Sequence, residues 1–150
     1  MRTVIQRVSS AAVTVNGVEI GRIARGLLIL LGIGQGDQVE DAQWLAGKLA
    51  RLRIFPDHEG LMNRSVVHID GGLLVISQFT LFASTAKGNR PAYLAAARPE
   101  AAEPLYRQFV ELLAAAAGRP VATGIFAADM RVELVNEGPV TVVIDSRQRE

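Results

Sequence analysis

The chain has 150 residues, a length typical of one domain with a sizeable core. Its composition, 49% apolar and 21% charged, is that of an ordinary globular protein, and the absence of cysteine excludes disulfides, thiolate metal sites and thiol nucleophiles. A net charge of +1 argues neither for nor against a nucleic-acid partner. The N-terminus has no apolar core of a signal peptide, and the longest apolar stretch, residues 27–33, is too short to span a bilayer, so we expect a cytoplasmic protein without a membrane partner.

Strand and turn signals dominate the first part of the chain. Apolar and β-branched runs predict strands at residues 3–8, 12–15 and 18–23. Asn16-Gly17, between the last two runs, is a strong signal for a two-residue hairpin turn. The run 27–33 is uniformly apolar, which predicts a strand covered on both faces.

Two segments carry helical periodicity. The first is expected to begin at Asp37 and to run to about Arg53, because Asp37 and Glu40 have the spacing of a capping box. The second is expected at about residues 100–117, and Gly118 suits its C-terminal cap. Both have apolar stripes typical of helices that pack on a core: Val39, Ala42, Leu45, Leu49 and Leu52 in the first, and Leu105, Phe109, Leu112 and Leu113 in the second.

The remaining elements are strands and loops. Strand-like runs lie at residues 73–82, 121–126, 130–135 and 140–144, with a turn-rich break at 55–60 and a polar loop at 83–92. Because strands outnumber helices, we expect an α/β fold with mixed, largely antiparallel sheets in a two-layer or barrel-like system and two helices packed on one side. Residues 1–145 would form one domain and residues 146–150 a C-terminal tail, with fraying from Asp145 onward.

Two patterns suggest familiar ligand chemistry that we do not expect here. The glycine-rich segment 32–36 lies between a strand and a helix, as in a dinucleotide-binding loop, but Asp37 occupies the place of the third glycine and would repel a pyrophosphate. His58 and His68, the only histidines, lack metal-ligand spacing, and no serine has the glycine pattern of a nucleophile elbow. Sequence order alone does not exclude a Ser-His-Asp triad, but neither a metal nor a cofactor is expected.

Two short segments carry the more informative residues. In Ser77-Gln78-Phe79-Thr80-Leu81, a strand would place Ser77 and Phe79 on one side and Gln78 and Thr80 on the other. The hydroxyls could be satisfied by neighbouring backbone, and no base that would activate them lies nearby in sequence. If the site is hydrolytic, oriented backbone donors therefore matter more than a side-chain nucleophile.

The second segment is Asn136-Glu137-Gly138-Pro139-Val140-Thr141. The default interpretation of its Gly-Pro pair is a tight turn. Glycine can adopt backbone angles barred to other residues, while proline fixes φ and has no N–H. A carbonyl beside such a pair is not consumed by sheet pairing and can face a ligand.

A locally basic stretch follows the first segment. Residues 71–99 contain no Asp or Glu but include Lys87, Arg90 and Arg98, so this region could attract a phosphate backbone. A solvated loop remains the alternative interpretation.

The order of these motifs resembles the D-aminoacyl-tRNA deacylase family along nearly the whole chain. The matching landmarks are Ile5-Gln6-Arg7-Val8, Gly26-Leu27-Leu28, Arg53-Ile54-Phe55, Met62-Asn63, residues 77–81, Arg90-Pro91, residues 126–130 and residues 136–141. The two signatures at 77–81 and 136–141 show no departure from the family pattern. The resemblance implies a hydrolase acting on carboxylic ester bonds, which releases a D-amino acid from the terminal adenosine of tRNA as a proofreading step, and which also accepts glycine mischarged onto tRNA(Ala).

The resemblance also implies how the site is assembled. The family forms homodimers in which the Gly-Pro pair of one subunit, with a cis peptide bond, enters the active site of the other. Gly138 and Pro139 would hold the substrate amino group and leave no space for an L side chain. The implied partners are aminoacylated tRNA and a second copy of the chain, with no DNA and no membrane.

Further site residues are carried over from the same resemblance. Ser77, Gln78, Phe79 and Thr80 would form the catalytic wall. Two mechanisms are open: Thr80 as nucleophile, or a ribose 2′-OH that assists water while the N–H groups of Phe79 and Thr80 stabilise the oxyanion. We favour the second, because no base for Thr80 is evident. The more peripheral assignments are Phe126 and Met130 at the adenosine pocket, Arg7 as a brace of the Gly-Pro segment, and Lys87 and Arg90 at tRNA phosphates.

Two rival functions remain at this point. One is a deacylase of mischarged L-aminoacyl-tRNA or glycyl-tRNA on the same fold, although related L-selective enzymes vary at the Gly-Pro segment. The other is a non-catalytic tRNA-binding module.

Overall fold

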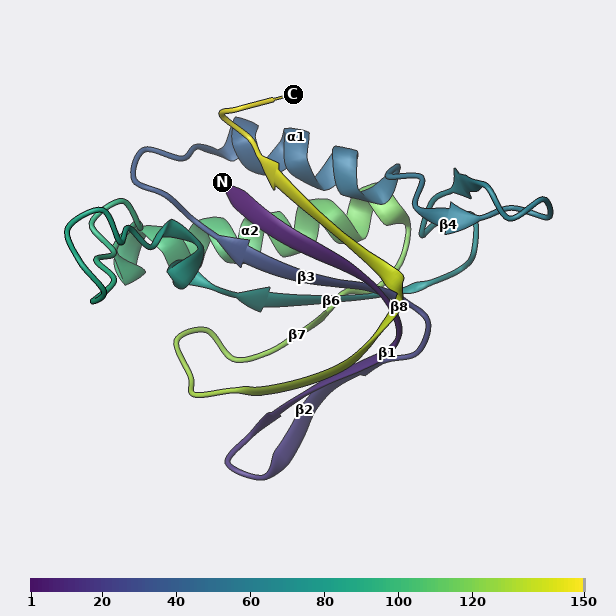
Figure 1. The fold of residues 1–150 in the computed structure, drawn as a ribbon, viewed down its shortest axis with the longest axis horizontal. Helices are drawn as coiled ribbons and strands as arrows, with labels where there is room; N and C mark the ends of the chain where they lie inside the picture. The colour runs from purple at the N-terminus through teal and green to yellow at the C-terminus, as the bar shows by residue number, and fades with distance from the viewer. Residues whose placement is uncertain (150) are drawn as a thin grey trace.

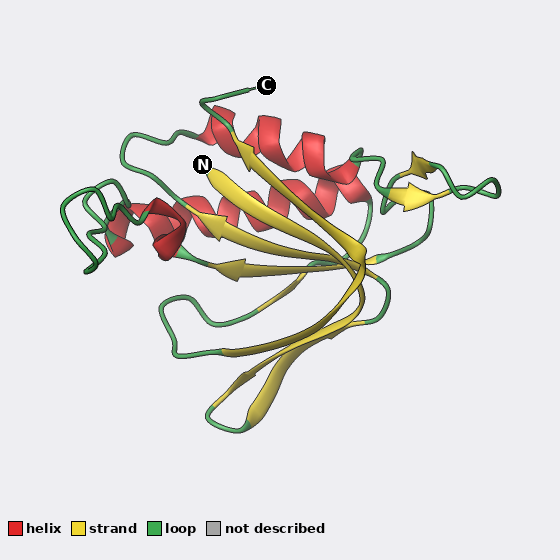
Figure 2. Ribbon diagram, viewed as in Figure 1, coloured by secondary structure: helices red, strands yellow, loops and turns green. Residues whose placement is uncertain are grey.

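The computed structural model describes residues 1–149 and arranges them as a strongly curved sheet with two helices on one side (Figure 2). The elements are β1 (Arg2–Val15), β2 (Val18–Ile23), β3 (Gly26–Gly32), α1 (Val39–Ala50), β4 (Phe55–Pro56), β5 (Met62–Arg64), β6 (Gly72–Ser77), the short 3₁₀ helix η1 (Phe79–Phe82), α2 (Pro99–Ala117), β7 (Ala122–Thr123) and β8 (Arg131–Asp145).

The main sheet is mixed and nearly closes on itself. Its strand order is β2-β1-β3-β6-β7, and β8 pairs with β1. The pairs of β1 with β2, β3 and β8 are antiparallel, whereas β6 runs parallel to both β3 and β7. A Cβ on Gly21 of β2 would lie 2.9 Å from the carbonyl oxygen of Thr123 in β7, so the two ends of the strand order approach each other. The predicted barrel-like sheet system is therefore confirmed, and β4 and β5 form a separate two-stranded sheet.

The apolar strand β3 is covered on both faces, as its sequence predicts. Leu27, Ile29 and Leu31 face the larger core, which also contains the buried sides of α1 and α2. Leu28 faces a second core, enclosed by the curved sheet, together with Leu74 and Ile76 of β6. Alternate side chains thus point into two different cores, which is why the strand has no polar face.

Both predicted helices form, but the first begins later than expected. The N-cap of α1 is Gln38, and the Asp41 carboxylate accepts the Gln38 N–H at 3.0 Å. The prediction of Asp37 and Glu40 as the capping pair is therefore wrong. Asp37 instead accepts the N–H of Gly34 at 2.6 Å and pairs with the Met1 ammonium at 2.9 Å, because both groups lie buried beside it. The second helix ends at Ala117 and is capped by Gly118, whose φ is +65°, as its sequence predicts.

Four strand predictions differ from the structure. Residues 3–8 and 12–15, expected as two strands, belong to the single long strand β1. The run 73–82 does not remain a strand: β6 ends at Ser77 and the chain turns into η1. The run 121–126 contributes only two strand residues. Residues 130–135 and 140–144, expected as two strands, belong to the single long strand β8.

The chain end is anchored rather than frayed at its start. Asp145 belongs to β8 and accepts two hydrogen bonds from Arg2, each at 3.1 Å. The Ser146 side chain is buried, and its hydroxyl accepts a hydrogen bond from the Met1 ammonium at 2.6 Å. The expectation of fraying from Asp145 is wrong at these two positions, and residue 150 lies outside the described residues. None of the helices within residues 1–149 is both long and apolar enough to cross a membrane.

Candidate active site

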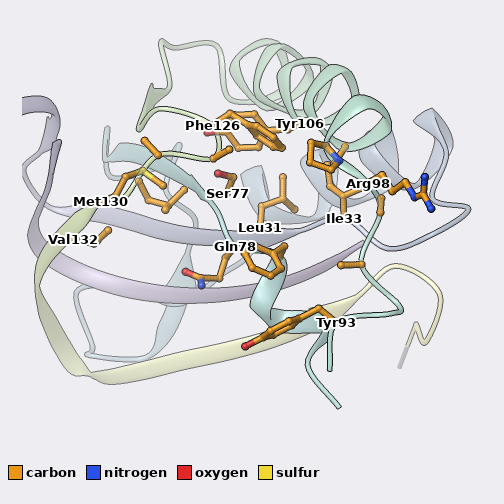
Figure 3. Close-up of a pocket in the computed structure, with 18 residues that line it drawn as sticks. Leu31, Ile33, Ser77, Gln78, Tyr93, Arg98, Tyr106, Phe126, Met130 and Val132 are labelled. Atoms are coloured by element: carbon orange, nitrogen blue, oxygen red, sulfur yellow. The ribbon is translucent and has the colours of Figure 1, made fainter. Parts of the chain in front are cut away.

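A cavity of about 590 Å³ opens beside the end of β6, a volume typical of a small-molecule site. It lies between β3, the chain after β6, the first turns of α2 and the segment that leads into β8. Five of the residues assigned to the site from the sequence line it: Ser77, Gln78, Phe79, Phe126 and Met130. Figure 3 shows Ser77 and Gln78 between Phe126 and Tyr106 at one end and Tyr93 at the other.

The wall at Ser77 and Gln78 is positioned by the neighbouring strand β3. Ser77 is the last residue of β6 in register with β3, opposite Leu31. The Gln78 N–H donates to the Leu31 carbonyl at 2.8 Å, after which the chain turns into η1. The strand-like alternation expected for residues 77–81 is therefore wrong beyond Ser77.

The turn into η1 leaves two backbone donors free. The N–H groups of Leu81 and Ala83 donate to the carbonyls of Gln78 and Thr80. The N–H groups of Phe79 and Thr80 precede the first such bond, as expected at the start of a helical turn, and within residues 1–149 neither is paired with an acceptor. Such a pair of adjacent donors can stabilise a negative oxygen.

The Thr80 hydroxyl has an amide rather than a base as its neighbour. Its oxygen accepts a short hydrogen bond from Nε2 of Gln78, and the residue does not line the cavity. Among the described residues that do line it, there is no Asp, Glu or His. The cavity therefore offers no side chain that would act as a general base at neutral pH.

The far end of the cavity is aromatic and firmly held. Tyr106 of α2 and Phe126 contact each other with ring centroids 5.7 Å apart. The Tyr106 hydroxyl donates to the Val75 carbonyl at 2.9 Å, and burial raises the pKa of this phenol to about 12, so it remains a donor at neutral pH. Met130 lines the cavity beside these rings.

Gly138 and Pro139 lie in an irregular segment of β8 rather than in a simple tight turn. Gln6 of β1 pairs with Thr141 and Val8 pairs with Asn136, so residues 137–140 all stand opposite one residue, Arg7. The Gly138–Pro139 peptide is cis, and both residues are exposed. Gly138 has φ +137°, an angle that L side chains rarely adopt, and a Cβ there would lie 3.0 Å from a guanidinium nitrogen of Arg7.

Arg7 contacts this bulged segment directly. Its Nε donates to the Glu137 carbonyl at 2.9 Å, and a terminal nitrogen donates to the Ile54 carbonyl at 2.6 Å. The Glu137 carboxylate lies 3.6 Å from the same Nε and 3.3 Å from that of Arg25. One guanidinium thus ties the bulge to the segment that follows α1.

The two ends of the bulge are held by the remaining polar residues of the motif. Asn136 accepts the Val140 N–H at 3.0 Å and donates to the Thr141 hydroxyl at 3.0 Å. Sequence reasoning did not assign roles to Asn136 and Thr141, although their presence at both ends of the Gly-Pro pair was a usable signal. It also gave no site role to the aromatic residues Tyr93 and Tyr106, which line the cavity, and it named Arg98 only as part of a basic stretch.

Within one chain, the Gly-Pro segment and the cavity wall lie far apart. Arg7, opposite the bulge, is in register with Leu27 of β3, whereas Ser77 is in register with Leu31. Those four residues correspond to about 13 Å along a strand. Figure 1 shows the bend in β8 at the end of the sheet opposite η1, and neither Gly138 nor Pro139 lines the cavity.

The remaining sequence-assigned positions lie outside the cavity. Lys87 and Arg90 are exposed in the loop after η1. His58 is exposed, and Nδ1 of His68 lies 3.1 Å from the Ser65 backbone nitrogen, whose N–H it accepts. Neither histidine lines the cavity, and the described part of the chain contains no cluster of three or more His, Asp or Glu side chains suited to a metal ion.

A family model and a curated relative point to the same family. Residues 4–145 match the family model described as D-Tyr-tRNA(Tyr) deacylase. A protein from Opitutus terrae named D-aminoacyl-tRNA deacylase is 61% identical over 150 residues, with 100% of both chains covered.

Solved structures share the same architecture. One described as c-Myc DNA Unwinding Element Binding Protein has a TM-score of 0.91 and 38% identity, covering 97% of this chain and 98% of the other. Another, described as a probable eukaryotic D-amino acid tRNA deacylase, has a TM-score of 0.79 and covers 95% of this chain and 97% of the other. At 18% identity, this second similarity concerns the fold alone.

Proposed function

The chain belongs to the D-aminoacyl-tRNA deacylase family, hydrolases that act on ester bonds, and we propose that it cleaves its substrate at the wall formed by Ser77, Gln78 and Phe79. The reaction releases a D-amino acid from tRNA. The observation that supports this wall most directly is the combination of two unpaired backbone donors with a cavity that has no Asp, Glu or His in its described lining.

Ester hydrolysis needs stabilisation of the oxygen that becomes negative when water attacks the carbonyl carbon. The N–H groups of Phe79 and Thr80 are suited to this role because they are adjacent and unpaired in the described chain. The ribose 2′-OH beside the ester is the group that we infer relays a proton from the attacking water to the 3′ oxygen, which leaves as a hydroxyl when the acyl C–O bond breaks. Thr80 then positions the wall through its hydrogen bond with Gln78 and does not act as nucleophile.

The selection of the D enantiomer is assigned to Gly138 and Pro139 of a second subunit. These residues are exposed and about 13 Å along the sheet from the cavity wall of their own chain, so they would reach a wall only in another copy. The edge of β8 that carries them pairs with no strand within residues 1–149, and its Val135 and Val143 are more than half exposed. A homodimer through this edge would cover that apolar surface.

The same steric selection explains why glycine would be accepted. An L side chain would collide with the inserted segment, whereas glycine has no side chain on either side. Glycine mischarged onto tRNA(Ala) is therefore a proposed second substrate.

The tRNA itself is proposed to bind along the cavity and the loop after η1. The apolar end with Phe126 and Met130 would hold the terminal adenosine, and Lys87 and Arg90 would meet phosphates. DNA is not a proposed partner, and the cytoplasm, where tRNA is charged and used, is the proposed location.

Incubation with D-Tyr-tRNA and L-Tyr-tRNA in parallel tests this assignment. We expect release of D-tyrosine only, with glycine released from Gly-tRNA(Ala) as well. Release of L-tyrosine would favour an L-selective deacylase, and binding of tRNA without any release would favour a non-catalytic module. Gly138→Ala is the variant that probes the selecting segment, because it places a Cβ at φ +137° while leaving Ser77, Gln78 and Phe79 of its own chain unchanged.

A further inference from the structure

Two exposed aromatic rings, those of Phe79 and Tyr93, line the cavity, and the reaction described above uses neither ring but only the backbone N–H of Phe79. The rings of Phe79 and Tyr93 contact each other edge to face, with centroids 4.9 Å apart and planes at 71°. Phe79 is 57% and Tyr93 37% exposed, so both rings are accessible to a ligand. An edge-to-face contact occupies one face of one ring only, so flat ring surface remains free for a further stacking partner.

The backbone on both sides of Tyr93 is fixed. Ala92 exchanges two hydrogen bonds with Ser84, at 2.8 and 2.9 Å, and so closes the loop before Tyr93. After it, the Gln35 N–H donates to the Ala95 carbonyl at 2.9 Å, and the Gln35 side chain donates to the Leu94 carbonyl at 2.6 Å. A ring held in this way loses little conformational freedom when a ligand stacks on it.

The charge around this ring pair favours a nucleic acid over a protein or an apolar ligand. The loop that Ser84 and Ala92 close carries Lys87 and Arg90, and Arg98 lines the same cavity as Tyr93. No Asp or Glu occurs between residues 71 and 99. Aromatic rings combined with a surrounding positive charge are the usual way in which proteins bind single-stranded nucleic acid.

We propose that Tyr93 and Phe79 form a stacking platform for the base that precedes the terminal adenosine of the charged strand. The proposal rests on the proposed function, because it needs the terminal adenosine at the Phe126 end of the cavity. In Figure 3, Tyr93 lies at the opposite end from Phe126, with Ser77 and Gln78 between them. The preceding nucleotide is joined to the 5′ oxygen of the terminal ribose, and the exposed rings of Phe79 and Tyr93 line the open side of the cavity, through which that strand would leave.

Two substrates of different length test the platform. The kcat/KM of Tyr93→Ala and of the wild type is measured on D-Tyr-tRNA and on the 3′-O-D-tyrosyl ester of adenosine, which lacks the preceding base. Loss of base–aromatic stacking should lower kcat/KM at least about fivefold more on the tRNA than on the adenosine ester. The change should appear mainly in KM, because stacking is present in the ground state and in the transition state alike.

Two variants and one modified tRNA serve as controls. Tyr93→Phe should behave as the wild type, because it keeps the ring and removes only the hydroxyl. Leu94→Ala, at a side chain that is 85% exposed, should have no effect on either substrate. A D-Tyr-tRNA with an abasic residue before its terminal adenosine should abolish the difference between Tyr93→Ala and the wild type.

Several outcomes would overturn the proposal. An equal loss on both substrates would place Tyr93 at the amino acid or the adenosine, and no loss on either would show that the ring is unused. A shift of Tyr93→Ala toward monomer in sedimentation would make the ring pair a subunit contact. If the wild type cleaves neither substrate, the proposed function fails and the stacking platform fails with it. If it cleaves both, and the effect of Tyr93→Ala does not depend on the preceding base, only the stacking platform is rejected.

Discussion

Replacement of Arg7 is the perturbation that most directly tests the structure of the Gly-Pro bulge. The guanidinium donates to two carbonyls, those of Glu137 and Ile54, which belong to segments far apart in sequence. Its side chain is only 11% exposed, so water cannot readily replace these bonds. Arg7→Lys keeps the charge but presents one nitrogen in place of the planar fork, and it can satisfy only one of the two carbonyls.

The expected cost follows from these contacts. A hydrogen bond from a charged donor contributes about 1.5–3 kcal/mol, so Arg7→Lys should lower the free energy of unfolding by about that amount and Arg7→Ala by up to twice as much. The ion pair with Glu137 adds little, because exposed pairs contribute about 0–1 kcal/mol and this carboxylate is 38% exposed. A typical domain has only about 5–15 kcal/mol of stability, so the Lys variant should still fold.

Urea unfolding followed by the fluorescence of Trp44, the single tryptophan, measures this loss, and hydrolysis of D-Tyr-tRNA measures its effect on activity. We expect a lower midpoint for Arg7→Lys and a reduced kcat/KM under conditions in which the variant remains folded. Arg22→Lys is the matched control, because Arg22 is 59% exposed and, within residues 1–149, forms its side-chain ion pair with Glu19 of its own strand. Equal midpoints and equal rates for Arg7→Lys and Arg22→Lys would refute the assignment of Arg7 as a brace.

Four further outcomes are expected from single substitutions. Thr80→Ala should keep kcat within about tenfold of the wild type, and a loss above about 10³-fold would establish Thr80 as nucleophile. Tyr106→Phe should lower the free energy of unfolding by about 1–2 kcal/mol in urea, because the Val75 carbonyl loses its donor. Since burial raises the pKa of Tyr106 to about 12, the wild type should also lose stability between pH ~10 and 12, and this loss should be smaller in the variant. Burial opposes ionisation of the Asp145 carboxyl, but hydrogen bonds from the Arg147 N–H and the Arg2 guanidinium outweigh it and lower the pKa of Asp145. The ionised carboxylate therefore contributes stability above pH ~4, and this contribution is lost as the pH falls further. The stability of Asp145→Asn should accordingly fall less steeply in acid than that of the wild type. Lys87→Ala should reduce the slope of the logarithm of tRNA affinity against the logarithm of salt concentration by about one. An unchanged slope would show that the loop is solvated and does not contact phosphates.

The start of α1 illustrates what local sequence patterns can and cannot predict. The helix and its apolar face follow from periodicity, and Ala42, Leu45 and Leu49 are buried as that pattern indicates. The cap was predicted one residue too early, because Asp37 has a partner that local spacing cannot reveal. The Met1 ammonium, 36 positions away along the sequence, lies 2.9 Å from its carboxylate.

The end of β6 shows a related limit. Hydrophobicity continues through Leu81 and Phe82, so the sequence predicts one strand to residue 82. The strand stops at Ser77 because its last register partner is Leu31, and its neighbour β3 ends at Gly32. Where a strand loses its partner is decided by the length of another segment, which no local pattern encodes.

Some residues of the candidate site could be found from motifs, but their arrangement could not. Two signatures in the right order identified the family, and the cavity contains Ser77, Gln78 and Phe79 together with Phe126 and Met130. The sequence does not predict a site role for Tyr106, because an aromatic residue on a helix is usually part of the core. Its hydroxyl bond to Val75 is a tertiary contact, visible only once α2 is placed against β6.

The hydrogen bond between the Tyr106 hydroxyl and the Val75 carbonyl affects which substitutions should lower the rate of hydrolysis. If the N–H groups of Phe79 and Thr80 stabilise the oxyanion, their position depends on what holds the backbone on either side. The Val75 carbonyl is fixed by the buried Tyr106 hydroxyl, and the Gln78 N–H by the Leu31 carbonyl. A donor that moves by about 1 Å can cost a hundredfold in rate. Substitutions that shift α2 against β6 should therefore impair catalysis more than truncation of the Thr80 hydroxyl, although they lie further from the substrate.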